Sequence, residues 1–319
     1  MTNEERLKTS KAQIYTFARC QYSEWRIVAV RSIQKILLNL DDFYSDLGPC
    51  LEANDEERNI VHYQIRNGWF YEAVSQAEQA IEDLFSTLMN LDDLAYFAKH
   101  VIQYRASKVK KYIWDFQTDN LRYICEQFKM PFFPLDEPWE NEIAHEQYID
   151  AILRTQEYLA DLQRFHKKHY IDYCQYKHGL SVALTQMGRP LLKKDVERQN
   201  SIMEHPQENC LQTFHQGTIT EYEQRNKQIP AAGILLDEGI SKHVGELHAE
   251  GNLLFFTMHG IDLNEIVRVT ERACILLKTL WKTILWECEE KESDEFHRVA
   301  FPLESINRIL EIGFPRGED

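Results

Sequence analysis

The chain contains few of the residues that break helices. Glycine occurs 12 times and proline 9 times in 319 residues, and both shares are below the average for globular proteins. A β fold rich in turns would need more of both, so this composition favours long helices. Aromatic residues make up 12% of the chain and hydrophobic residues 44%, which excludes a chain too polar to bury a core.

Disulfide, secretion and membrane signals are also missing. The seven cysteines are odd in number and widely spaced, which does not suit a disulfide framework but suits a reducing cytosol. Residues 1–6 lack the basic and then apolar pattern of a signal peptide. The longest apolar runs, such as residues 253–256, are far too short to cross a bilayer. We therefore expect a cytoplasmic protein without membrane contact.

The common cofactor and metal motifs are absent too. No phosphate loop, Gly-x-Gly-x-x-Gly run or Gly-x-Ser-x-Gly elbow occurs. Residues 243–250 offer two histidines and two glutamates, and His205, Cys210 and His215 follow one another at five-residue intervals. Neither set has the spacing of a zinc site or of a metalloprotease helix. We expect no cofactor and no metal.

Hydrophobic periodicity predicts an all-α fold of long helices. Residues with three- and four-residue apolar spacing, or with helix start and stop signals, lie at 24–47, 55–89, 91–104, 107–130, 141–178 and 262–290. The last of these begins with a capping box at residues 262–265. Periodicity fades in residues 180–260, which we interpret as a small β and loop insertion, and residues 306–312 are expected to form a weak amphipathic turn.

The chain is expected to be a single helical domain over residues 1–319. The proline-rich residues 129–142 are the best candidate for an internal boundary. Residues 66–90 and 141–178 carry small or aromatic stripes suited to pairing with another helix, which favours a homodimer.

Charge is distributed unevenly along the chain. The net charge is −15, yet residues 161–200 contain 8 basic and only 4 acidic side chains. Within this island, residues 162–179 hold three histidines and four cationic side chains on one predicted helix that stops at Gly179. Such a cluster is either a chance accumulation on a solvated helix face or a surface that binds phosphate.

The residue types in this segment suit phosphate chemistry. Arginine holds a phosphate, and a neutral histidine exchanges a proton near pH 7. Arg164 precedes His169 by five positions, and Lys177 and His178 lie at the helix end. We therefore predict that Arg164, His169 and His178 are the catalytic residues. We predict that Lys168, Tyr173 and Lys177 bind the phosphate or the RNA.

An alternative interpretation needs no site. His166 and His169 continue an aliphatic row on their helix and would then be hydrogen-bonded core residues. Lys177 and His178 in the last helical turn would simply offset the helix dipole.

An Arg-x4–6-His motif on a late helix of a helical bundle resembles the HEPN superfamily (higher eukaryotes and prokaryotes nucleotide-binding). The Tyr-Lys-His-Gly run at residues 176–179, which ends a helix and is followed by loops or strands and a last long helix, is similar to an uncharacterised bacterial branch near that superfamily. The resemblance implies a metal-independent RNase of a toxin or defence system, with a composite cleft formed by a dimer. The chain departs from the pattern at Phe165, where a polar residue is usual, and in having no arginine four to six residues before His178.

Three hypotheses follow. In the first, a ribose 2′-hydroxyl attacks the adjacent phosphate, with His169 or His178 as the base and Arg164 and Lys177 holding the phosphate. In the second, a non-catalytic helical protein uses residues 161–200 to bind a nucleotide or a protein partner. A purely structural role with core histidines is the third reading.

Overall fold

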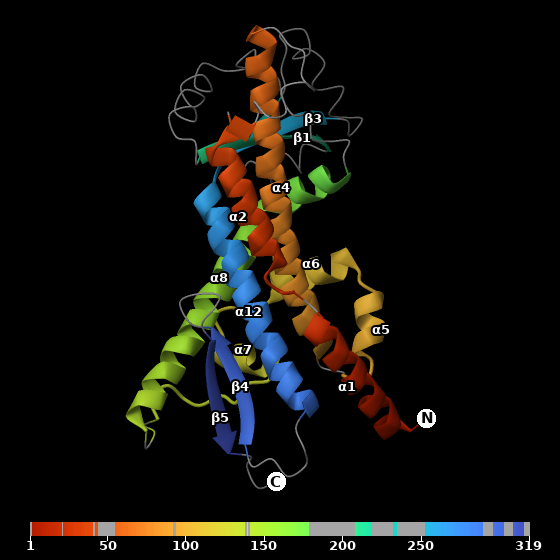
Figure 1. The fold of residues 1–319 in the computed structure, drawn as a ribbon, viewed down its shortest axis with the longest axis vertical. Helices are drawn as coiled ribbons and strands as arrows, with labels where there is room; N and C mark the ends of the chain where they lie inside the picture. Colours follow the sequence, from red (N-terminus) through yellow and green to blue (C-terminus); the bar gives the residue numbers. More distant parts are fainter. Residues whose placement is uncertain are drawn as a thin grey trace. The chain divides into compact units, whose positions relative to one another are not determined.

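Helices make up most of the described chain (Figure 1). The computed structural model describes residues 2–20, 22–40, 42–43, 55–91, 94–137, 139, 141–178, 208–217, 232–234, 253–289, 296–302 and 309–315. The helices of this part are α1 (Asn3–Cys20), α2 (Trp25–Leu38), α4 (Asp55–Asn90), α5 (Phe97–Ile102), α6 (Ala106–Asp115), α7 (Leu121–Gln127), α8 (Glu142–His178) and α12 (Leu263–Glu289). The predicted all-α class is confirmed, since α1, α2, α4, α8 and α12 are each between 14 and 37 residues long.

Strands form two small antiparallel sheets. In the first, β3 (Leu253–Asp262) lies between β1 (Glu208–Gly217) and β2 (Ala232–Ile234). The second is the hairpin of β4 (Phe296–Pro302) and β5 (Ile309–Pro315), which lie side by side in Figure 1. The prediction of an amphipathic turn at 306–312 is wrong at residues 309–312, which belong to β5. The prediction that strands occur only within 180–260 is also wrong, because β4 and β5 lie after residue 260. Val299, Ala300 and Phe301 of β4 are all buried, so side chains on both faces of this strand are covered by protein.

The stretch predicted as one helix over 107–130 consists of two helices. Phe116, the residue after α6, has an extended backbone. The Asn120 side chain then accepts a hydrogen bond from the Tyr123 N–H and caps α7. Lys129 ends this helix with a φ of 55°, a left-handed conformation typical of helix C-termini. The predicted helix at 91–104 is likewise shorter, and α1 was not predicted.

Two compact units make up the chain. The first contains residues 1–28, 77–167 and 268–319, and the second contains residues 29–76 and 168–267. The boundary proposed at 129–142 therefore lies inside the first unit, and the single domain stays a prediction. Among the described helices, none combines the length and the apolar character that a membrane span requires.

The core of the first unit is built from apolar rows that the sequence predicted. Buried positions on α4 recur at helical spacing, as do those on α8 and α12. They include Ala77, Ala80, Ile81, Leu84 and Leu88 of α4, Ile152, Leu159 and Leu162 of α8, and Val269, Ala273, Leu277, Leu280 and Ile284 of α12. Rigid aliphatic rows on these helices hold their polar neighbours at fixed positions, which matters for the site described below.

The second unit contains the first sheet and the remaining parts of α4 and α8. The rings of Tyr71 on α4 and Tyr176 on α8 are stacked, with centroids 5.5 Å apart. The Tyr176 hydroxyl donates to Glu72 at 3.3 Å, and burial followed by the Glu72 charge raises the pKa of Tyr176. At the start of α12, the Asp262 carboxylate accepts the Asn264 N–H at 2.9 Å, which confirms the N-cap half of the capping box predicted at residues 262–265.

Gly68 provides a test of the helix in this unit. It lies inside α4, which continues through the Asn67–Gly68 pair, and a Cβ added at Gly68 would meet no atom within 4 Å. Because glycine in a helix interior costs roughly 0.5–1 kcal/mol relative to alanine, Gly68→Ala should raise the free energy of unfolding by about that amount in urea titrations. Ala73→Gly, at a buried position of the same helix, should lower it. A destabilised Gly68→Ala variant would contradict the continuous helix.

Candidate functional site

The residues predicted to form a site all lie on α8, but they differ in burial. Arg164 is exposed, Lys168 is half-buried, and Lys177 is exposed over the Tyr173 ring at 5.4 Å. His169 and Tyr173 are buried. His178 is the last residue of α8, and its side chain lies outside the described part. The cations therefore reach the surface, whereas the His169 imidazole is enclosed by protein in this conformation.

A second histidine of the segment is also inside. His166 Nδ1 lies 2.6 Å from Glu78 Oε2, and both side chains are 0% exposed. The distance fits a hydrogen bond from the imidazole N–H to the carboxylate, and it ties α8 to α4 within the first unit. Sequence reasoning identified His166 as a candidate core histidine but missed Glu78, an acidic residue next to the buried alanine row of α4.

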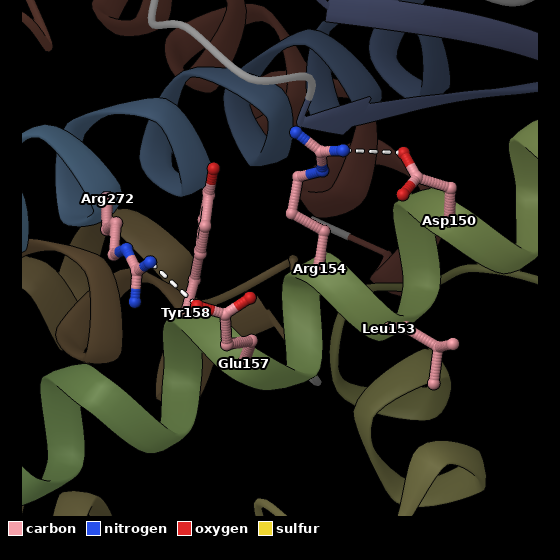
Figure 2. A pocket seen from close by; sticks show the side chains of 6 residues that line it. All are labelled: Asp150, Leu153, Arg154, Glu157, Tyr158 and Arg272. Atoms are coloured by element: carbon pink, nitrogen blue, oxygen red, sulfur yellow. Dashed lines mark hydrogen bonds and ion pairs between the residues drawn. The ribbon is translucent and has the colours of Figure 1, made fainter.

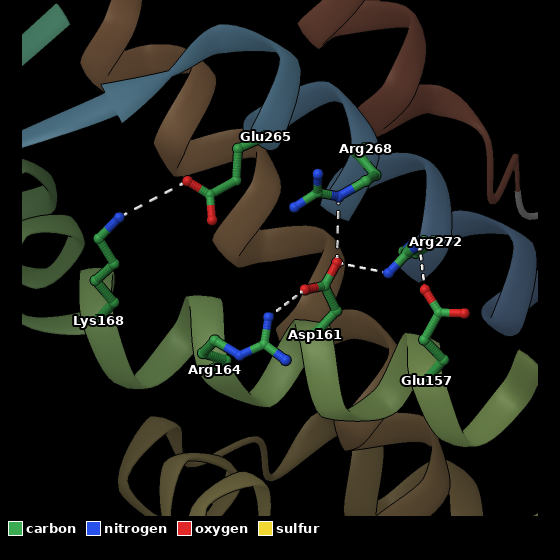
Figure 3. Close-up of polar contacts among 7 residues, drawn as sticks. All are labelled: Glu157, Asp161, Arg164, Lys168, Glu265, Arg268 and Arg272. Carbon is green, nitrogen blue, oxygen red and sulfur yellow. Dashed lines mark hydrogen bonds and ion pairs between the residues drawn. The ribbon is translucent and has the colours of Figure 1, made fainter.

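The exposed part of the segment converges on one carboxylate. Asp161 on α8 accepts from Arg164 Nη1 at 2.8 Å through Oδ1, and from Arg268 Nε at 3.3 Å and Arg272 Nη1 at 2.6 Å through Oδ2. Arg272 Nη2 also donates to Glu157 at 2.7 Å. Figure 3 shows the three guanidinium groups directed toward Asp161. We call Arg164, Arg268 and Arg272, with Asp161 at their centre, the arginine cluster; it lies in the first unit.

The helical repeat explains this arrangement. Glu157, Asp161 and Arg164 follow one another at four and three residues on α8, so they share one face of the helix. Arg268 and Arg272 are four residues apart on α12 and likewise share a face. Each helix therefore presents a short row of charged side chains. The arginines of α12 meet the two carboxylates of the α8 row, Glu157 and Asp161.

The cluster has an excess of positive charge at the surface. Three guanidinium groups face the two carboxylates of Asp161 and Glu157. The Asp161 side chain is 9% exposed, whereas Arg164 is 72% and Arg268 51% exposed. Each of these two arginines bonds to Asp161 through one nitrogen, and a guanidinium has five N–H donors. The outer arginines are thus oriented by Asp161 while much of each side chain faces solvent, an arrangement suited to holding an anion.

A pocket adjoins the cluster in the same unit. It has a volume of about 440 Å³ and is lined by Asp150, Leu153, Arg154, Glu157, Tyr158 and Arg272; Figure 2 shows these side chains around it. Arg154 donates to Asp150 at 2.7 Å, and the Arg272 guanidinium lies 4.6 Å above the centre of the Tyr158 ring. Burial lowers the pKa of Arg154, but Asp150 and Tyr158 raise it by more, so the net pKa is raised and the side chain stays charged.

The sequence indicated only part of this site. Arg164 was identified, but Arg268 and Arg272 lie about a hundred residues away, outside the basic island. Their four-residue spacing on the polar face of α12 was the available signal. That spacing does not reveal which helix the face meets, so Asp161 could not be identified as their common partner.

No three histidine, cysteine or acidic side chains in the described ranges are grouped closely enough to hold a metal ion. Residues 243–250 and His205 lie outside the described part. Cys210 and His215 fall on β1, where the backbone alone is described. Comparison with protein-family models, with curated proteins and with solved structures found no match to this chain.

The His166–Glu78 pair should act as a structural contact. Removing one partner of a buried pair leaves the other buried without it and typically costs about 3–5 kcal/mol. His166→Leu and Glu78→Leu should each lower the free energy of unfolding by roughly that amount, and the double variant by clearly less than the sum of the two. Urea titrations of the four proteins form the required cycle.

Lys167→Leu is the matched control, because this exposed neighbour on α8 should change stability by at most about 0.5 kcal/mol. Single variants as stable as the control, or strictly additive losses, would show that the two side chains do not stabilise one another.

Proposed function

We propose that the protein binds a phosphate-bearing ligand, a nucleotide or RNA, at the arginine cluster, and that it acts there as a binding module. The observation that carries this proposal is the orientation of three arginines by one nearly buried carboxylate. Arginines that are held in place before binding lose less side-chain entropy when they bind an anion. Two of them, Arg164 and Arg268, are also exposed enough to reach one.

Charge selects the class of ligand. The whole chain carries −15, so an anion approaching most of its surface is repelled. The cluster has three cations to two carboxylates, and paired guanidinium groups match the several oxygens of a phosphate. An acidic protein segment would present carboxylates to the same arginines, so it is included as a competitor in the test below.

RNA cleavage is supported less well by the geometry. A nuclease of the proposed kind needs an imidazole that reaches the phosphate held by Arg164. His166 and His169 are both fully buried, so neither reaches a surface phosphate in this conformation. The HEPN resemblance, the homodimer, the cytoplasmic location and a catalytic role for His178 stay predictions, and a binding function requires none of them.

The arginines give a direct test. Arg164→Gln and Arg268→Gln should each weaken binding of a short, fluorescently labelled single-stranded RNA by roughly 5- to 10-fold, the scale of one exposed charge-assisted hydrogen bond. Fluorescence anisotropy at several salt concentrations should also show a smaller salt dependence for each variant, because fewer counterions are released. Inorganic pyrophosphate should compete with the RNA.

Arg105→Gln serves as the control, since Arg105 is an exposed arginine in front of α6. Equal affinity for RNA and pyrophosphate in wild type and in the double variant Arg164→Gln/Arg268→Gln would refute the proposal. Displacement of both by a poly-glutamate peptide at lower concentration than by pyrophosphate would instead favour a protein partner. Recovery of the intact RNA after incubation distinguishes binding from cleavage.

A further inference from the structure

The pocket beside the arginine cluster is continuous with it. Arg272 belongs to both, because it bonds to Asp161 in the cluster and to Glu157 at the pocket while covering the Tyr158 ring. Glu157 and Arg164 are seven residues apart on α8, which is about 10 Å along a helix. A ligand of modest size therefore reaches both places at once, with its phosphate at Arg164 and Arg268.

The pocket differs from the cluster in the charge that it presents. Among its charged side chains the two acidic ones are the more exposed, with Asp150 57% and Glu157 64% exposed, whereas Arg154 is only 18% and Arg272 19% exposed. An entering group therefore meets carboxylates first. A carboxylate accepts several hydrogen bonds, so Asp150 and Glu157 can each accept one from a ligand while keeping the arginine already bonded to it. The pocket consequently selects a hydrogen-bond donor.

The walls of the pocket suit a flat group. The planar Arg272 guanidinium lies over Tyr158 and offers its own face for stacking. Leu153, an exposed apolar side chain, also lines the pocket. The volume of about 440 Å³ falls within the range of sites that take small organic molecules.

We propose that this pocket is the second half of the phosphate site and binds a ring that carries an amino group. The ligand class is a phosphate ester with an amino-bearing ring, whose amino group extends toward Glu157 while its phosphate meets Arg164; these two residues are about 10 Å apart along the helix, and their side chains reach toward the ligand. Cytosine nucleotides have this chemistry, because carboxylates accept hydrogen bonds from the cytosine amino group. A carbonyl at the same ring position, as in uracil, meets carboxylate oxygens and is disfavoured. The inference rests on the proposed phosphate binding.

Isothermal titration of the whole protein with matched ligands tests it. Cytidine 5′-monophosphate should bind about 5- to 100-fold more tightly than uridine 5′-monophosphate, the scale of one well-formed contact to a base edge. Ribose 5-phosphate, which lacks the base, should bind no more tightly than uridine 5′-monophosphate. Cytidine- and uridine-rich short RNAs form a second arm: a preference seen with the free nucleotides identifies a small-molecule ligand, and one seen with the RNAs alone identifies RNA.

Two surface variants separate the pocket from the cluster. Glu157→Gln should abolish the preference for cytidine while ribose 5-phosphate binds at least as well, because an amide presents both a donor and an acceptor. Leu153→Trp should fill the pocket and reduce cytidine 5′-monophosphate to the affinity of ribose 5-phosphate. The controls are Glu146→Gln and Ile143→Trp, which make the same changes at exposed positions of α8.

The outcomes distinguish this inference from the function on which it rests. Equal binding of the cytidine, uridine and ribose phosphates, with no preference between the two RNAs, overturns the pocket while phosphate binding at the cluster stands. A cytidine preference that survives both Glu157→Gln and Leu153→Trp places base recognition elsewhere and also overturns it. Absence of binding by every compound, pyrophosphate included, ends both proposals.

Discussion

The carboxylate of Asp161 is the contact on which the candidate site depends. Three guanidinium groups gathered without a counter-charge would repel one another, and the exposed pair would extend into solvent instead of sharing one location. Asp161 is nearly buried, so its attraction is screened less than that of a surface carboxylate. It also receives arginines from two helices, α8 and α12. One side chain thus links two helices whose packing comes from their apolar rows, and it orients the arginines to which the proposed anion would bind.

Burial divides the polar side chains of α8 into two roles. His166 and Asp161 are five residues apart, roughly 140° around the helix. His166 meets Glu78 in the interior, while Asp161 organises arginines at the surface. The inward pair contributes to packing because both members are removed from water together. In the outward cluster Arg164 and Arg268 stay largely hydrated, which limits what their ion pairs add to stability and leaves these two arginines available for a ligand.

Sequence reasoning succeeded where a feature is local and periodic. The rows of α4 and α12 and the Asp262 cap needed only spacing along one helix. It failed where a partner is distant in sequence: the arginines of α12 and the glutamate beside His166 become informative only once the helices have packed. The β4–β5 hairpin was missed because β4 is short and its apolar residues Val299, Ala300 and Phe301 are consecutive, so the strand shows no alternation of apolar and polar side chains. The sequence did indicate that His166 and His169 are buried, because they continue an aliphatic row on their helix. Their burial favours a role as core residues over a role in catalysis.

The acidity of the chain limits which ligand suits the cluster. Repulsion between a protein of charge −15 and a polyanion grows with every phosphate that approaches without meeting a cation. The arginine cluster, with an excess of one positive charge over Asp161 and Glu157, can compensate the charge of only one phosphodiester group. A long nucleic acid would gain little there and be repelled over the rest of its length, whereas a small phosphate ester gains the full local attraction. The affinity must then come from contacts to the remainder of the ligand, and the pocket that shares Arg272 with the cluster is where the described structure can supply them.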